Sequence, residues 1–335
     1  MEFGPVPIAK AEGAVLAHSV KVPGGRLKKG IVLGVEDIEA LAAAGLAEVT
    51  VARLGPDDVG ENEAARIIAE ALVPDPGAVG LRIAPAHTGR VNIHADRVGL
   101  ARLDPSRLMA VNATDEMITL ATVQPWQRME AGQMLATVKI IPYGLARASI
   151  EAAAEAGRGA ISLAPVVVAA AELIVTSHEA GSSEETGKGT RAIEARLAAL
   201  GMQLTDVTTV PHETDALARA LAAAAAPMVL VLTASATSDP RDVGPEALRR
   251  AGGQVVRFGL PVDPGNLLFH GTMADGRPMI GLPGCARSPA LNGADWVLER
   301  LAAGLAVGPE DTARMGVGGL LKEMPGRRQP RESRR

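Results

Sequence analysis

The sequence predicts an α/β protein whose C-terminal half folds as a three-layer domain around a mostly parallel sheet. Three observations support this prediction. From residue 171 onward, short apolar runs alternate with helix-like stretches, which is the pattern of parallel strands joined by helical crossovers. Before that, one region consists of short strand-like runs, and the chain begins with mixed strand, hairpin and helix patterns. We therefore expect an N-terminal α+β unit (1–75), a β-rich unit (81–145), the α/β domain (171–305) and a tail (306–335).

Length and composition limit the class of protein. A chain of 335 residues exceeds one typical domain, and aromatic residues make up only 2%, so aliphatic side chains must fill the cores. The formal net charge is -4 with mixed signs, which gives no electrostatic footprint for nucleic acid or an anionic membrane. The single cysteine, Cys285, excludes an intramolecular disulfide, and no apolar run is long enough for a membrane span. We expect a cytoplasmic protein with neither nucleic-acid nor membrane partners.

The first 145 residues give local patterns of strands and helices. A strand is expected over residues 13–22, followed by a turn at Gly24-Gly25, a helix ending at Gly45, a strand over 46–54 and a helix over 61–72. The β-rich unit should contain strands at RVNIHA, GLARL, MITLATV and MLATVKII, and a helix should follow it in EAAAEAGRGA. Within this unit, Arg90 and Lys139 can bind an oxyanion, although scattered polar residues on a half-solvated sheet are commoner.

The predicted α/β domain has a regular order of elements. Strands are expected at ELIVT, MVLVLT, QVVRF and PMIGL, and helices at RAIEARLAALG, PHETDALARALAAA and PEALRRAGG. The last helix should begin with Ser288 as its N-cap and Pro289 as its first helical residue, and should stop at Gly304. In sheets of this kind, ligands bind beyond the carboxyl ends of the strands. The loops at that edge are therefore the candidate site.

The loop over residues 233–243, TASATSDPRDV, is rich in hydroxyls that follow a buried strand. Hydroxyls and backbone N–H groups between small side chains suit an anionic ligand, whereas the ordinary alternative is a polar turn. Its candidate ligand-binding residues are Thr233, Ser235, Thr237 and Ser238. Asp239 and Asp242 can hold a divalent cation such as magnesium against phosphate oxygens. On the residues alone, however, capping of the next helix is the favoured role of Asp242.

Two further loops follow predicted strand ends. In LPVDPGNLLFHG, Pro264 and Gly265 force a turn, and Asn266 offers amide donors and an acceptor. In GLPGCARSPALNG, small and rigid residues shape a tight connection and a capped helix start, so the candidates there are Gly281, Pro283, Gly284 and Ser288. Arg287 lies beside this cap and can bind a phosphate, while Cys285 is favoured as a structural thiol or an incidental part of the pocket wall rather than as a nucleophile.

These three loops, in this order, resemble the molybdopterin-binding domain shared by molybdopterin molybdenumtransferases and molybdopterin adenylyltransferases. The segments VDPGNLLFHG and GLPGCARSPALNGADWVLERL are most similar to the molybdenumtransferase side. The domain's opening, ELIVTSHEAG, stands where that family has a strand ending in Thr-Gly and an acidic residue. The resemblance covers residues 171–305. It implies a molybdopterin ligand, contacts from Thr176 and Glu179, and a metal-assisted catalytic role for Asp242, with Asp239 as a second candidate.

The chain also departs from that family. Ala234 and Ser235 replace two glycines of the first ligand loop, and Asp239 stands where a further glycine is usual. At the opening strand, Ser177 and His178 replace the usual residues, so only Glu179 carries over from that motif. A bulkier and more acidic loop repels a phosphate unless a cation intervenes. The resemblance therefore supports pterin binding more firmly than it supports catalysis.

Three functions remain open on the sequence. The leading hypothesis is a molybdenumtransferase-like transferase that uses magnesium to insert molybdate into molybdopterin or its adenylylated form. The second is a binding module that holds the cofactor for a separate nucleotidyltransferase or another molybdoenzyme-maturation partner. The third is a scaffold with a degenerate site, against which the four hydroxyls of residues 233–238 argue. A homo-oligomer is expected in each case.

Overall fold

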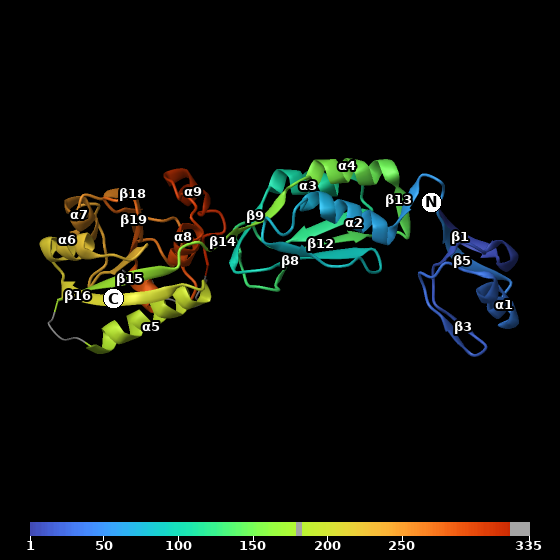
Figure 1. The fold of residues 1–335 in the computed structure, drawn as a ribbon, viewed down its shortest axis with the longest axis horizontal. Helices are drawn as coiled ribbons and strands as arrows, with labels where there is room; N and C mark the ends of the chain where they lie inside the picture. The colour runs from blue at the N-terminus through green and yellow to red at the C-terminus, as the bar shows by residue number, and fades with distance from the viewer. Residues whose placement is uncertain (179–182, 322–335) are drawn as a thin grey trace, which may run out of the picture. The chain divides into compact units, whose positions relative to one another are not determined.

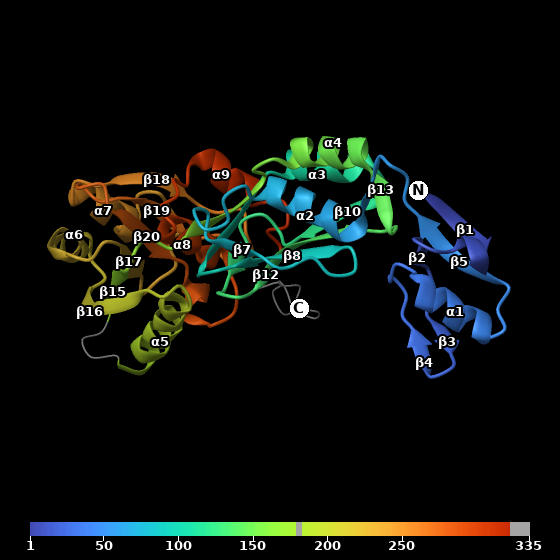
Figure 2. The ribbon, with the colours of Figure 1, turned by 45° about the vertical axis from the view of Figure 1, so that its right-hand side comes forward.

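The computed structural model describes residues 1–178 and 183–321, and the chain divides into two compact units, Met1–Pro165 and Val166–Arg335. The fold class predicted from the sequence is confirmed, because the second unit contains a six-stranded, mostly parallel sheet between helices. Figures 1 and 2 show the elements of both units. No helix within the described ranges is both long enough and apolar enough to span a bilayer.

The first unit begins with a small antiparallel sheet in the order β1-β5-β2, formed by β1 (Glu2–Pro7), β5 (Glu48–Arg53) and β2 (Val15–Leu16). A hairpin of β3 (Val20–Val22) and β4 (Gly25–Leu27) turns at Gly24, whose φ of 88° is readily adopted by glycine. Helix α1 (Val35–Ala43) buries Leu41 against Leu16 and Leu33. The predicted turn, helix and strand 46–54 are thus confirmed.

The rest of the first unit contains a four-stranded antiparallel sheet and three helices. The sheet has the order β10-β12-β8-β7, with bounds β10 (Ile118–Thr122), β12 (Met134–Ile140), β8 (Arg90–Ala95) and β7 (Leu81–Ile83). Two further groups of strands are β11 (Arg128–Met129), β9 (Gly99–Leu103) and β14 (Ile161–Pro165), and the pair β6 (Asp58–Gly60) and β13 (Gly144–Ala146). Figure 2 shows the helices on one side of the sheet: α2 (Glu61–Leu72), α3 (Pro105–Thr114) and α4 (Arg147–Gly157).

Helix α3 lies where the sequence predicted only short strand-like runs. It starts with a clear N-cap, because the Asp104 side chain accepts hydrogen bonds from the backbone N–H groups of Ser106 and Arg107, and Pro105 occupies the first helical position. Its buried face consists of Leu108 and Val111 alone, so its apolar periodicity is weak. The predicted strands on either side of it are confirmed.

The second unit is built on a sheet in the order β16-β15-β17-β20-β19-β18. Its first four strands are parallel, and β19 runs antiparallel to both of its neighbours. The strand bounds are β15 (Ala170–Ser177), β16 (Gln203–Pro211), β17 (Val229–Leu232), β18 (Gln254–Phe258), β19 (Phe269–Thr272) and β20 (Pro278–Leu282). Each predicted strand of this domain is present.

Helices cover both faces of this sheet (Figure 1): α5 (Ser183–Ala199) and α8 (Gly293–Ala302) on one face, and α6 (Thr214–Ala223) and α7 (Val243–Arg250) on the other. Strand β17 shows how the sequence produces three layers. Leu230 and Leu232 pack with α5 and α8, whereas Val229 and Val231 pack with α6 and α7. Successive side chains of a strand point to opposite faces, so an uninterrupted apolar run fits a strand buried on both sides.

The predicted start of the last long helix was wrong. Residues Gly284–Arg287 form a short 3-10 turn, and α8 begins at Gly293 rather than at Pro289. The reason is a stronger cap further along the chain. The Asn292 side chain accepts from the backbone N–H of Ala294, and Asp295 accepts in return from the backbone N–H of Asn292. The Ser288 hydroxyl accepts a 3.3 Å hydrogen bond from Ala290 N, and Ser288 caps no helix. A short final helix, α9 (Pro309–Arg314), follows α8.

The buried side chain of His270 in β19 should make the free energy of unfolding depend on pH. Its side chain is 2% exposed, its Nε2 atom has no hydrogen-bond partner within the described ranges, and burial, with a smaller contribution from Arg257, lowers its pKa to about 4. The unfolded chain binds this proton near pH 6.5, so the native state loses stability as pH falls from about 6.5 to about 4. Converted at 1.36 kcal/mol per pKa unit, the loss is on the order of 3 kcal/mol.

Urea unfolding at pH 7.5, 5.5 and 4.5 measures this effect. We expect His270→Leu to flatten the pH dependence relative to the parent chain. Equal slopes for His270→Leu and the parent would show that His270 does not titrate on unfolding.

Candidate functional site

The three predicted loops lie at one edge of the six-stranded sheet. Leu232 at the end of β17 pairs with Leu282 at the end of β20, so residues 233–243 and 283–288 leave the sheet side by side. Phe269 at the start of β19 pairs with Gly281 and with Phe258, which places the β18–β19 loop at the same edge. Neighbouring strands are about 4.8 Å apart, so all three loops fall within the reach of one small molecule.

The first loop is tied to the strand beside it. Ala234 N donates a 2.8 Å hydrogen bond to Thr176 Oγ1 at the end of β15, and Thr233 Oγ1 donates to the carbonyl of Ser235 at 2.7 Å. Thr176, Thr233 and Thr237 are buried, and the Thr237 hydroxyl lies 3.5 Å from that of Thr233. Ser235 and Ser238 are exposed. Of the predicted hydroxyls, the two serines therefore face solvent, while the threonines hold the loop in shape.

The two aspartates of this loop bind backbone donors. Asp242 is the N-cap of α7 and accepts from Val243 N at 2.7 Å and from Ser238 N at 3.1 Å, so the capping role that the residues favoured is confirmed. Asp239 accepts from the backbone N–H of Arg241 at 2.8 Å, and this bond lowers its pKa more than the Arg241 guanidinium does. Across residues 1–178 and 183–321, no three or more His, Cys, Asp or Glu side chains are grouped to hold a metal ion. Magnesium commonly uses only one or two carboxylates, and Asp242 keeps lone pairs for such a contact.

The second loop packs against the start of α8. Asp263-Pro264 is a cis peptide, and the carbonyl of Pro264 accepts from Gly293 N at 2.8 Å. Gly265 has a φ of 137°, and a Cβ there would stand 2.7 Å from Gly293 N, so only glycine fits. The structure therefore gives Pro264 and Gly265 a packing role. Asn266 is exposed, and its carbonyl accepts from Leu260 N at 3.0 Å.

The third loop combines packed and open positions. Gly281 lies against the ring of Phe269, which leaves no space for a side chain, and Pro283 is buried. Gly284 is exposed, and a Cβ there would have no neighbour within 4 Å. Arg287 donates a 3.0 Å hydrogen bond from its guanidinium to the carbonyl of Thr233, which joins this loop to the first one. The third loop thus has an exposed glycine and an arginine that is bonded to the first loop.

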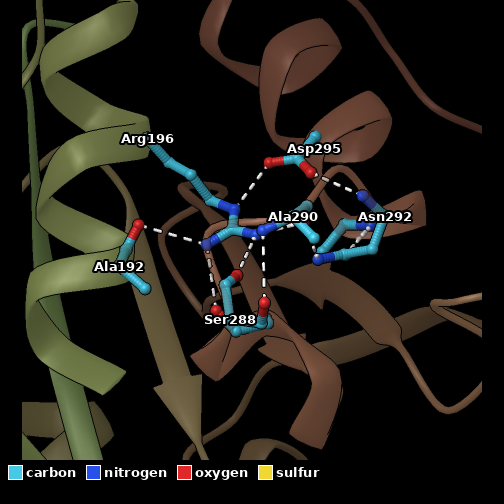
Figure 3. Close-up of polar contacts among 8 residues, drawn as sticks. Ala192, Arg196, Ser288, Ala290, Asn292 and Asp295 are labelled. Carbon is cyan, nitrogen blue, oxygen red and sulfur yellow. Dashed lines mark hydrogen bonds and ion pairs between the residues drawn. The ribbon is translucent and has the colours of Figure 1, made fainter. Parts of the chain in front are cut away.

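A buried arginine that the sequence did not single out shapes the third loop (Figure 3). Arg196 of α5 forms a 2.6 Å ion pair with Asp295 of α8, and both side chains are largely buried. Its other guanidinium nitrogens donate to the carbonyls of Ala192, Ala286, Ser288 and Ala290 at 2.7–3.1 Å. All three guanidinium nitrogens are thereby used inside the protein. Arg196 positions residues 286–290 and is not available to a ligand.

Sequence reasoning also missed His212, which follows β16 at the same edge. Its Nδ1 atom lies 2.8 Å from Thr176 Oγ1 and its Nε2 atom 3.0 Å from Ser235 Oγ. The ring of His178 stands edge-on to it with 4.8 Å between the centroids. Burial lowers the pKa of His212 more than the neighbouring His178 does, and Asp242 opposes both. The strand-end position of His212 was a signal that could have identified it.

The remaining residues that the sequence singled out are Glu179 and the pair Arg90 and Lys139. Glu179 falls outside the described residues. Arg90 and Lys139 of the first unit are cross-strand partners, but the Lys139 ammonium already donates to the carbonyl of Thr88 at 2.7 Å and lies 3.5 Å from a Glu61 carboxylate oxygen. Lys139 is therefore engaged inside its own unit.

Comparison with known protein families matches two segments of the chain. Residues 172–325 match the family model described as a probable molybdopterin binding domain, and residues 5–53 match the model of a domain of unknown function. Among solved structures, the chain is similar to the crystal structure of a molybdenum cofactor biosynthesis protein B. That similarity has 15% sequence identity and a TM-score of 0.28, and covers 40% of this chain and 88% of the other. No curated protein matches the chain. The segment matching the molybdopterin model includes all three loops.

Proposed function

We propose that this protein, whose residues 172–325 match the family model of a probable molybdopterin binding domain, binds molybdopterin at the carboxyl edge of its C-terminal sheet. The observation that carries the proposal is the meeting of the 233–243 and 283–288 loops at the paired ends of β17 and β20. Molybdopterin combines a flat pterin with a phosphate, so it needs open space, hydrogen-bond donors and a cation.

The side chains at this edge can supply each of these. Gly284 is exposed and a Cβ there would have no neighbour within 4 Å, so this position leaves room for a ligand, and Ser235 and Ser238 are exposed hydroxyls. Arg287 brings a guanidinium to the same edge, and within the described ranges the structure pairs it with no carboxylate. A charge-assisted hydrogen bond between guanidinium and phosphate is among the stronger contacts available to a protein.

Titration of the full chain with the oxidised, fluorescent derivative of molybdopterin tests this proposal. We expect saturable quenching at one site per chain. A flat titration at protein concentrations up to the solubility limit would contradict the proposal.

Within this function, we infer two alternatives for the step after binding. In the first, Asp242, with Asp239 beside it in the loop, holds magnesium, and the metal acts as a Lewis acid and template during molybdate insertion. In the second, the protein only holds the pterin for a nucleotidyltransferase. The backbone donors at both oxygens of Asp242, together with Ala234 and Ser235 in place of glycines, favour the second.

The substitution Asp242→Asn distinguishes the two alternatives. Asparagine is as good an N-cap as aspartate, so the fold should be kept, but the charge that a metal needs is lost. If the chain is a transferase, we expect magnesium-dependent molybdate insertion to disappear while pterin affinity stays within a few fold. The matched control is Asp275→Asn in the turn between β19 and β20, which removes a charge outside the candidate loops that is paired with Arg277. An inactive parent chain that binds pterin would contradict the transferase alternative and support the binding module.

A further inference from the structure

Four hydrogen-bonding groups form a continuous chain at the edge of the second unit. Ala234 N donates to Thr176 Oγ1 at 2.8 Å, Thr176 Oγ1 lies 2.8 Å from His212 Nδ1, and His212 Nε2 lies 3.0 Å from Ser235 Oγ. The groups come from the ends of β15, β16 and β17, which are adjacent in the sheet. Thr176 is buried, Ala234 and His212 are partly exposed, and Ser235 is exposed. The chain of bonds thus leads from the protein interior to the candidate site.

The direction of these hydrogen bonds follows from the partners that are available to the Thr176 hydroxyl. Its oxygen already accepts from Ala234 N, and its side chain is 2% exposed, so water cannot take its hydroxyl hydrogen. Within the described ranges, the remaining hydrogen-bond partner of this hydroxyl is His212 Nδ1. A buried hydroxyl rarely leaves its hydrogen unbonded, so Thr176 donates to Nδ1.

The tautomer of His212 then follows. A neutral imidazole that accepts at Nδ1 carries its hydrogen on Nε2, so Nε2 donates to Ser235 Oγ. The lowered pKa of His212, caused first by burial and next by His178, supports the neutral ring at pH 7. In this tautomer Nε2 cannot accept a proton from Ser235, so His212 is not a base that would activate Ser235 as a nucleophile. Ser235 instead has its own hydrogen free to donate outward.

We propose that His212 is a positioning residue that fixes Ser235 as a hydrogen-bond donor to an oxygen of the ligand's phosphate. The inference rests on the proposed molybdopterin binding and names the part of the ligand that this edge recognises. A donor that already accepts a hydrogen bond is polarised, which strengthens its bond to an anionic oxygen. The charged groups of the two loops are Arg287, which is bonded to the carbonyl of Thr233, Asp242, whose oxygens bind backbone donors, and Asp239, which is paired with Arg241. The cation therefore remains available to an anionic ligand.

Nitrogen-15 NMR of the full chain, labelled at histidine, tests the tautomer without any ligand. Comparison with His212→Gln assigns the His212 signals. At pH 7.5 we expect a neutral ring with its hydrogen on Nε2. A ring protonated on Nδ1, or on both nitrogens, would overturn the inference, because Thr176 would then have to accept from the ring.

Binding measurements test the ligand contact. The probes are the oxidised molybdopterin derivative with its phosphate and the same derivative after enzymatic removal of the phosphate. We expect Ser235→Ala and His212→Leu to weaken binding of the phosphorylated probe about tenfold or more and to leave the dephosphorylated probe unchanged. His212→Gln keeps an N–H donor near the Nε2 position, so it should restore most of the affinity. Ser106→Ala is the matched control, because that serine is also exposed but belongs to helix α3 of the first unit.

The outcomes separate this inference from the proposed function. If both probes bind and Ser235→Ala weakens both equally, or neither, the phosphate contact is wrong while pterin binding stands. If His212→Gln is as defective as His212→Leu, the donor role of His212 is wrong. If neither probe binds to the parent chain, the proposed function fails and the ligand contact fails with it, whatever the tautomer.

Discussion

The substitution Arg196→Met should lower the free energy of unfolding by about 3–5 kcal/mol, because it removes one partner of a buried ion pair and leaves Asp295 charged without its cation. Arg196 is 8% exposed and also donates to carbonyls of the 286–290 segment, for example that of Ser288 at 2.7 Å. Methionine fills a similar volume, so the loss should come from the unpaired polar groups. Urea unfolding of both chains measures the difference.

Two controls separate this effect from a general loss of charge. Arg219→Met, at a position of α6 that is not buried, should change the unfolding free energy by less than about 0.5 kcal/mol. The double variant Arg196→Met/Asp295→Leu should be more stable than the sum of its single variants predicts, because no unpaired charge remains. Additive effects of the two substitutions would contradict a coupled pair.

The second large effect is expected on binding. Gly284→Val should weaken molybdopterin binding by about tenfold or more while leaving the fold unchanged. A Cβ at Gly284 meets no atom within 4 Å, and its φ lies outside the left-handed region, so the protein can accept the side chain. The valine would then occupy the open space at the end of β20 that the proposed ligand needs. Fluorescence titration gives the affinity, and circular dichroism checks the fold.

The matched control is Gly4→Val in β1. A Cβ at Gly4 would also have no neighbour within 4 Å, but this glycine belongs to the first unit. The substitution should leave pterin affinity unchanged. A folded Gly284→Val protein with the affinity of the parent chain would remove this loop from the binding site.

Much of the fold could be predicted because its signals are local. The run of Val229 to Leu232 is apolar on both faces, as a strand between two helix layers must be, and helix α2 was predicted with the bounds that it has, Glu61–Leu72. The alternation of strands and helices after residue 171 was enough to place the loops at one edge of the sheet. Periodicity and capping within about fifteen residues carry this information.

The missed features depend on contacts between distant residues. Arg196 looks like an ordinary helical arginine, and its role appears only when Asp295, 99 positions away, is brought beside it. The role of His212 depends on its hydrogen bonds with Thr176 and Ser235, which lie 36 and 23 positions away in the sequence. The start of α8 was misplaced for a related reason. Ser288-Pro289 is a good local cap, but the reciprocal bonds of Asn292 and Asp295 outweigh it.

Isolation of the protein from cells that make molybdopterin tests most directly whether the C-terminal unit binds this pterin. The full chain is purified, its bound pterin is oxidised to the fluorescent derivative, and mass spectrometry identifies the product. We expect molybdopterin with its phosphate at up to one per chain, and a much smaller amount on Gly284→Val. Parent protein that carries no pterin, from cells shown to contain free molybdopterin, would contradict molybdopterin binding.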